Sequence, residues 1–481
     1  MKWYYIAIFA ASVLGIFQMA QVGTFGLPPI ELLFIGFWLY LPLHLFVARK
    51  PLRIPMNLEY VALIMFIATA FLSCFSVVFD GEYRLHQQVV KTILHFIFVF
   101  GVMFLHGHIR ITTDMIYGIL RFYLSLGIVL SLYAIYQVPA RIMDWPFAWI
   151  EITNVSYQGD VEFASGVSQL ALRFENFYRA TSIYPEPSAL GFASVLQIVV
   201  ALVPIIRQSR TILRTKWALA LSLTTSIIAL FLAFSMTGVL VMACCLLVVV
   251  VRYPKRVLRR LVPIIGATAI GIAVFDIVAS SFVNVSIIGM FGVRIESYLT
   301  GSAFNDDVGT ISGESATQRF DDVKIAIDVW KDAPIIGYGP GCFRHHQLGR
   351  MHNSNFPSSS FVMVLADYGL VGLLGYLVLL GSFVLTTFTF ERRWSQAGMR
   401  DRYPDQDTIV ALAPVIMVAF VVVNISGNTV INPVYWSQFV VIVAALQFSR
   451  KAFGEYNEVV LYGWRPSASN KMEVHREGKT P

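Results

Sequence analysis

Apolar stretches of about 20 residues, separated by polar segments, recur along most of the chain. A helix of this length crosses the ~30 Å hydrocarbon core of a bilayer, and it pairs its backbone groups within its own segment, as lipid requires. The pattern therefore predicts an all-α integral membrane protein with about twelve transmembrane helices. The predicted spans are residues 3–20, 28–48, 58–79, 89–107, 115–138, 188–206, 217–235, 238–251, 261–280, 360–382, 408–424 and 433–449.

Two of the polar segments, residues 139–187 and 281–359, are long, and long connections of this kind are usually functional. Each contains apolar residues at helical spacing, which predicts a short amphipathic helix over the span ends or along the membrane surface. Simple loop packing is the alternative. The spaced residues are Phe163, Val167, Leu170, Phe174 and Phe177 in the first loop, and Phe320, Val323, Ile327 and Trp330 in the second.

Composition supports the membrane assignment and changes the interpretation of the charge. The chain is 57% hydrophobic and only 14% charged, against about 25% charged residues in soluble domains. Its net charge of +7 could indicate a nucleic-acid partner, but cytoplasmic loops of membrane proteins also collect Lys and Arg. We therefore expect no nucleic-acid partner.

The distribution of basic residues predicts the orientation. With the N-terminus inside, most of the 36 Lys and Arg residues fall in inside segments, as the positive-inside bias requires. This arrangement puts both termini in the cytoplasm and both long loops outside. Residues 1–450 then form the polytopic membrane domain, and residues 451–481 form a polar, partly disordered cytoplasmic tail.

The stretch "RATSIYPEPSALGF", residues 179–192, combines a cation and an anion just before a predicted span. Each residue that precedes a proline is restricted to extended backbone. With Ser188 as the expected N-cap, Glu186 lies at the positive end of a helix dipole. Glu186 either stabilises this helix end or pairs with Arg179, or it belongs to a polar site at the outer mouth of the bundle that holds an anionic head group.

Other intramembrane acids favour an outward-facing site. Glu31, Asp276 and Asp367 all lie toward the outer ends of their predicted spans. Transporters and pumps usually carry ionisable residues at mid-depth, and no such chain of ionisable residues is visible here.

The second loop and its flanks carry a series of motifs in a fixed order. Arg319 precedes the predicted helix with Trp330; "GYGPG" (337–341), "HN" (352–353) and "LADYGLVGLLGYL" (365–377) follow. Together with "FSMTG" (234–238) and the earlier "YPEPS", this order resembles the O-antigen ligase and polymerase superfamily over residues 179–380. The arginine and "YPEPS" favour the polymerase branch. The glycines of "GYGPG" are expected to allow tight turns.

The resemblance implies a glycosyltransferase without a metal or other cofactor, at the periplasmic face of a bacterial inner membrane. Such enzymes move a glycan from a polyprenyl diphosphate carrier to an acceptor hydroxyl. Arg179 and Arg319 are the candidates for binding the substrate diphosphate, since guanidinium donors match phosphate oxygens. An ion pair between Arg319 and Asp322 is the alternative for the second arginine.

His352 of the "HN" pair is the candidate general base, because a histidine pKa near neutrality suits proton removal. It lies 17 positions before Gly369, farther than the family usually places it. His345, His346 and Glu186 remain alternatives, and the assigned catalytic residues are His352 and Glu186.

The implied donor and acceptor are undecaprenyl-diphosphate-linked glycans. Membrane lipid, a chain-length regulator and a flippase are the other expected partners. Three further functions stay open. They are a ligase that transfers the glycan to a lipid A core, a lipid-linked sugar flippase or transporter, and a non-catalytic assembly scaffold.

Overall fold

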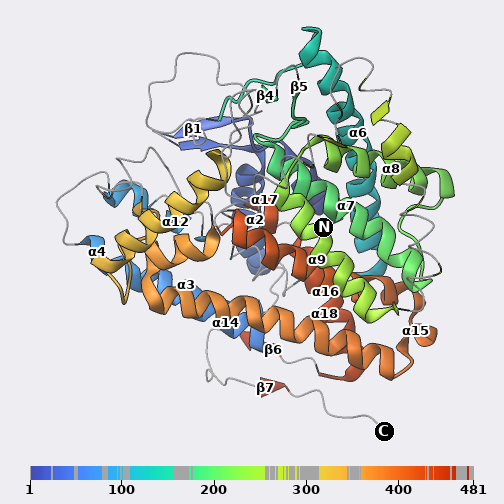
Figure 1. Ribbon diagram of the computed structural model, residues 1–481. Coiled ribbons are helices and arrows are strands. Elements are labelled where there is room, and N and C mark those ends of the chain that lie inside the picture. Colours follow the sequence, from blue (N-terminus) through green and yellow to red (C-terminus); the bar gives the residue numbers. More distant parts are fainter. Residues whose placement is uncertain are drawn as a thin grey trace.

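The computed structural model describes six long stretches of the chain together with short pieces of the segments between them. The stretches are residues 2–78 except 23–24 and 48–51, 109–154, 177–254, 314–343, 359–427 and 438–455. These residues are mostly helical (Figure 1). The helices are α1 Lys2–Val13, α2 Pro29–Val47, α3 Leu58–Ser73, α4 Phe75–Val78, α6 Thr113–Ile142, α7 Pro187–Arg207, α8 Lys216–Leu232, α9 Met236–Arg252, α12 Glu314–Asp332, α14 Ser360–Gln396, α15 Met399–Arg402, α16 Pro404–Ser426, α17 Pro433–Trp436 and α18 Phe439–Phe453. The strands are β1 Ala20–Val22, β2 Phe25–Leu27, β3 Leu52–Pro55, β4 Arg173–Phe174, β5 Phe177–Tyr178, β6 Glu458–Leu461 and β7 Val474–His475.

Six helical segments of the described chain are long and apolar enough to cross a membrane: α2, α3 with α4, α6, α7, α14 and α16. The apolar helices α8 and α9 are shorter, at 17 residues each. These helices support a multi-pass membrane protein with an all-α membrane domain. The predicted number of twelve spans is not confirmed, and the spans predicted at 89–107 and 261–280 lie partly outside the described residues.

Two sequence predictions of helices are wrong at one end. The first predicted span continues to residue 20, but α1 ends at Val13, and after a turn β1 pairs antiparallel with β2. The amphipathic helix predicted across residues 163–177 is wrong at its end, where Phe174 of β4 pairs with Phe177 of β5 in an antiparallel hairpin; apart from Gln169, residues 163–172 lie outside the described chain. Neither hydropathy nor the helical spacing of apolar residues predicts such local pairing of strands.

Helices α7 and α16 form the centre of the bundle. In the most apolar 18-residue stretch of each helix, 89% of the residues are buried in α7 and 83% in α16, against 28% in α2. Helices α6, α8 and α9 pack on α7, and helices α9, α14 and α18 pack on α16. Helix α3 packs along α14 (Figure 1). A Cβ atom added to Gly191 of α7 would lie 3.5 Å from the Cα of Gly238 and 2.8 Å from the Cβ of Ser235. Small residues thus let α7 and α9 approach closely, as in many membrane bundles.

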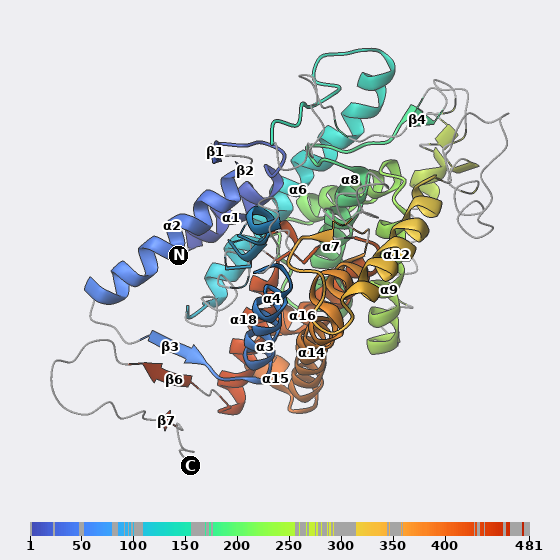
Figure 2. The same ribbon diagram turned by 90° about the vertical axis from the view of Figure 1, so that its left-hand side faces the viewer.

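The predicted inside and outside segments gather at opposite ends of the molecule. At one end β3 pairs with β6, so that the start of the predicted tail folds back onto the loop after α2. At the other end the Asn154 side chain donates to the Gly15 carbonyl at 2.8 Å, next to the β1–β2 hairpin. Figure 2 shows β3, β6 and α15 toward the bottom, and β1, β2 and β4 toward the top. We call these the inner and outer ends, and their orientation in the cell stays a prediction.

The amphipathic helix predicted in the second loop is present as α12, but its buried face is not the expected one. Ala326 and Val329 pack with Phe343 and with Ala366 of α14. The predicted stripe lies beside this face, and its residue Ile327 is exposed. Helix α12 therefore packs on α14 through Ala326 and Val329, and Ile327 of the predicted stripe is not part of this contact.

The "GYGPG" segment turns tightly against α14, as its glycines predict. Gly337, Gly339 and Gly341 all have positive φ. The carboxylate of Asp367 accepts hydrogen bonds from the backbone N–H groups of Gly341 and Phe343, both at 3.1 Å. Asp367 is fully buried, so it holds this loop and does not belong to an outward-facing polar site.

Gly369 interrupts α14 at the same contact, with φ 66° and ψ −165°. The chain opens there, and the N–H groups of Leu370 and Val371 donate to the carbonyls of Pro334 and Ile335. A Cβ on Gly369 would lie 2.4 Å from the Ile335 carbonyl oxygen. Only glycine adopts this backbone region at low cost.

Replacing Gly369 by alanine should therefore destabilise the protein by at least about 1–3 kcal/mol from backbone strain alone. The matched control is Gly381→Ala in the same helix, where no atom lies within 4 Å of the added Cβ and alanine favours the helix. Thermal unfolding in detergent measures both. Equal melting temperatures for the two variants would show that the break at Gly369 is dispensable.

Candidate active site

A cavity of about 290 Å³ opens at the outer end of the bundle. Small-molecule sites usually occupy roughly 300–1,000 Å³, so this volume lies at their lower limit. The C-terminal ends of α1 and α16, the N-terminal ends of α7 and α9, and α17 surround it. Its polar lining residues are Ser12, Tyr123, Tyr184, Glu186, Ser188, Thr237, Ser426, Tyr435 and Gln438. The cavity thus brings "YPEPS" and "FSMTG" to one place.

Glu186 is the only charged side chain among the described residues that line this cavity. It is the N-cap residue of α7, with Pro187 in the first turn. The prediction of Ser188 as N-cap is wrong, because proline favours the first helical position and so starts the helix two residues earlier. The Ser188 hydroxyl instead donates to the Glu186 carboxylate at 2.5 Å. Glu186 remains exposed, at the positive end of the helix dipole.

Three side chains hold the segment that leads to Glu186. The guanidinium of Arg141 donates to the carbonyl oxygen of Arg179 and to the Thr181 hydroxyl, the latter at 2.7 Å. The Gln137 amide oxygen accepts from the backbone N–H of Ser182 at 2.6 Å. The Gln169 amide nitrogen donates to the Tyr184 carbonyl at 2.7 Å. Because these polar groups are buried, each bond is costly to lose, and the "YPEPS" backbone is fixed before any ligand binds.

Tyr184 contributes a hydroxyl to the cavity wall. Burial raises the pKa of this phenol above its ordinary value, since the charged form would lose its hydration. The hydroxyl therefore stays neutral at physiological pH and can donate a hydrogen bond.

The wall formed by α16 is joined to the segment that carries Arg319. The Ser360 hydroxyl at the start of α14 donates to the Gly427 carbonyl at 2.7 Å, and Gly427 lines the cavity. Helix α12 packs on the same part of α14. The "LADYGLVGLLGYL" helix thus connects the cavity to α12.

The candidate residues from the sequence have different positions in the structure. Glu186 lines the cavity, whereas Arg179 is buried and is not among the lining residues. Arg319 lies in α12, but its side chain is outside the described part of the chain, as are His345 and His352. In the described residues no ion pair joins Glu186 to Arg179. The structure therefore does not support that alternative.

His346, one of the alternative bases, is held by a carboxylate. Its Nε2 lies 2.8 Å from the Asp332 Oδ2 at the end of α12, and its ring meets the Tyr338 ring edge-on with the centroids 4.9 Å apart. A histidine oriented by a carboxylate is a suitable proton acceptor, so His346 remains an alternative.

Sequence reasoning missed Arg141 as a residue that positions the site. The fifth span was predicted to end at residue 138, but α6 continues to Ile142 and carries Arg141 with it. The guanidinium also lies 4.3 Å from the centre of the Trp149 ring, a cation–π contact. An arginine close behind a span is not informative by itself, because its partners are distant in sequence.

Arg141→Lys keeps the charge but loses the fork of donors, and should destabilise the protein by about 1–3 kcal/mol. The loss arises because buried acceptors on Thr181 and Gln169 lose their partner. Thermal unfolding checks it, with Arg121→Lys as the control. Arg121 lies in the same helix and donates only to the Ile212 carbonyl among described partners. Equal effects of both variants would contradict the positioning role.

The comparison with known families agrees with the motifs. Residues 218–377 match the family described as O-antigen ligase. Members of this family are glycosyltransferase-like enzymes that act on lipid-linked polysaccharide substrates in general. No curated protein matches the chain. The matched residues run from α8 into α14 and include "FSMTG", α12, "GYGPG" and the break at Gly369. This match covers a third of the chain, and it supports the resemblance to the O-antigen ligase and polymerase superfamily that the motifs indicate.

Proposed function

We propose that the protein is a surface polysaccharide polymerase that elongates a glycan on a polyprenyl diphosphate carrier at the periplasmic face of the bacterial inner membrane. The observation that carries this proposal is the cavity at the outer end, where "YPEPS" and "FSMTG" meet around Glu186. The second support is the match of the adjoining residues 218–377 to the O-antigen ligase family.

In the proposed reaction, an acceptor hydroxyl on a fresh lipid-linked repeat unit attacks the anomeric carbon of the donor glycan. A new glycosidic bond forms, and the bond to the carrier oxygen breaks. The lipid diphosphate leaves with the electron pair, and direct displacement inverts the anomeric carbon. The hydroxyl proton passes to a base, for which we propose His352, with Glu186 and His346 as alternatives.

The leaving diphosphate gains negative charge as the bond breaks. The guanidinium groups of Arg179 and Arg319 bind the diphosphate and stabilise this charge. A preorganised donor contributes roughly 3 kcal/mol to a transition state in well-studied sites. The backbone at Arg179, five residues before the lining residue Tyr184, is held in place, since the Arg179 carbonyl accepts from Arg141 and the Ala180 N–H donates to the Leu232 carbonyl at 3.0 Å. Arg319 comes from the segment joined to the cavity through α14.

The ligase is the second candidate, because the matching family is described by that activity. A polymerase and a ligase share the donor and differ in the acceptor. We expect purified protein in detergent, given lipid-diphosphate repeat units without added metal, to form a ladder of longer lipid-linked chains. Mass spectrometry of the products measures this. Transfer only when a lipid A core is added would assign the ligase, and no transfer to either acceptor would contradict both.

A further inference from the structure

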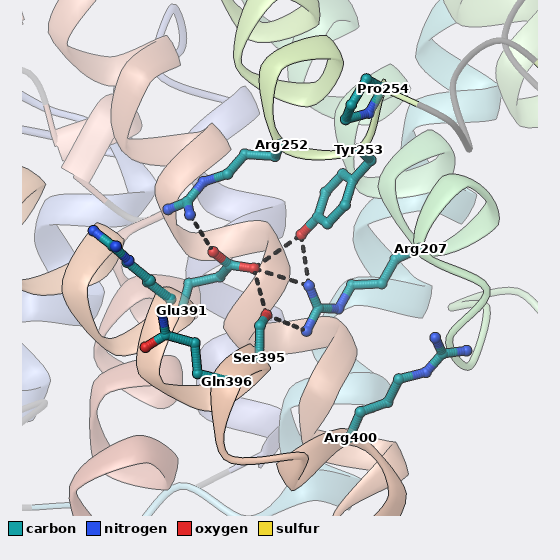
Figure 3. Close-up of a pocket in the computed structure, with 9 residues that line it drawn as sticks. Arg207, Arg252, Tyr253, Pro254, Glu391, Ser395, Gln396 and Arg400 are labelled. Atoms are coloured by element: carbon teal, nitrogen blue, oxygen red, sulfur yellow. Dashed lines mark hydrogen bonds and ion pairs between the residues drawn. The ribbon is translucent and has the colours of Figure 1, made fainter.

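The inner end of the bundle contains a cluster of charged side chains far from the proposed active site. The Arg207 guanidinium donates to both carboxylate oxygens of Asp407, at 2.6 and 2.7 Å, and to Glu391 at 2.8 Å. Arg252 reaches the other oxygen of Glu391 at 2.9 Å. Figure 3 shows Glu391 between Arg252, Tyr253, Arg207 and Ser395. Arg207, Glu391 and Asp407 are all buried, so these ion pairs are shielded from water.

A pocket of about 530 Å³ lies over this cluster and is lined by more cations than anions. Arg207, Arg252, Arg392 and Arg400 line it, and Glu391 is the only acid among its described lining residues. Arg392 is exposed, and among the described residues Arg400 donates to a neutral group, the backbone carbonyl of Gln208 at 2.9 Å. Even with Asp407 counted, the pocket keeps an excess of positive charge and offers the planar donor groups that suit phosphate.

A second hollow, of about 550 Å³, continues from this pocket between α9 and α14. Arg252 and Arg392 line both, and the remaining wall is formed by Leu247, Val248, Val251, Phe388 and Thr389. Leu247 and Val251 are 62% and 71% exposed. Both helices carry apolar residues of the membrane domain, so these exposed side chains are suited to contact with lipid chains.

We propose that these two hollows form one binding site for an anionic phospholipid. The headgroup phosphate occupies the arginine-lined pocket, with Arg392 and Arg400 as its donors, and an acyl chain lies in the groove between α9 and α14. A free phosphate would use only the first hollow, whereas an anionic lipid uses both. Basic pockets between transmembrane helices bind such headgroups on the cytoplasmic side, which is where the basic residues place this end.

The test compares lipid retention by purified full-length protein, measured by native mass spectrometry after exchange into cardiolipin or phosphatidylethanolamine. Wild type should retain cardiolipin in preference to phosphatidylethanolamine. The Arg392→Gln/Arg400→Gln double variant should lose this preference by about tenfold or more, since each surface cation contributes on the order of 1 kcal/mol. The matched control is Arg393→Gln/Arg402→Gln, which removes two nearby arginines that do not line the pocket.

A second pair of variants tests the groove. Thr389→Trp should fill it and reduce cardiolipin retention, whereas Leu385→Trp, an exposed position one turn earlier outside the lining, should not. Equal retention by wild type and the Arg392/Arg400 variant would overturn the proposal, as would equal losses in the two double variants. Inorganic phosphate that displaces cardiolipin at millimolar concentration would also overturn it, because the site would then be selective for phosphate alone.

Discussion

Arg207→Ala should destabilise the protein by about 3–5 kcal/mol, because it leaves Asp407 and Glu391 buried without their main cation. The Arg207 side chain is 4% exposed, and those of the two acids are 0% and 3% exposed. The cluster joins the end of α7 to α14 and α16, and α7 and α16 are the two helices at the centre of the bundle. Loss of this contact should therefore reduce the cooperative melting temperature in detergent and not merely loosen one loop.

The control for this prediction is Arg210→Ala, three residues away. Arg210 pairs with Asp405 at 2.9 Å, but the two side chains are 41% and 51% exposed. Exposed pairs contribute about 0–1 kcal/mol, so this variant should melt close to wild type. If both variants melted at the wild-type temperature, the buried cluster would not have the structural role that we assign to it.

Arg319→Ala should reduce glycan transfer by about 10²–10³-fold, the usual cost of removing one preorganised donor at a developing negative charge. Under the proposed function its guanidinium stabilises the departing diphosphate, so kcat should fall more than KM rises. The measurement is the elongation of a lipid-diphosphate oligosaccharide by purified protein without metal.

Lys324→Ala is the matched control, because Lys324 is an exposed cation on the same helix. It should transfer at the wild-type rate. Normal transfer by Arg319→Ala would show that the charge is stabilised elsewhere and would leave Arg319 with a structural role, such as an ion pair with Asp322.

Sequence patterns predicted the features that depend on local composition. The spans at 217–235 and 408–424 correspond to α8 and α16, whose observed bounds are Lys216–Leu232 and Pro404–Ser426. Hydropathy detects such helices because their apolar content is continuous. The predicted spans and orientation put Glu186 and the turn of "FSMTG" at the same end of the bundle, and Glu186 and Thr237 both line the cavity there.

Features that depend on partners distant in the chain could not be predicted in this way. Arg141 is informative only beside Gln169 and Thr181, 28 and 40 residues away. The break in α14 at Gly369 exists because Pro334 and Ile335 offer carbonyls to the opened backbone. Asp367 resembles an outward-facing acid by its place in the span, but the glycine loop folds over it and buries it.

Cysteine labelling with substrate protection tests the central claim most directly, namely that the lipid diphosphate binds in the outer cavity. Ser188→Cys places a thiol in its wall, and Lys216→Cys places one at the inner end. We expect a bulky maleimide at position 188 to stop transfer, and lipid-diphosphate oligosaccharide to slow that labelling without affecting position 216. Unchanged labelling at position 188 with saturating substrate, together with full transfer by the labelled protein, would contradict the account.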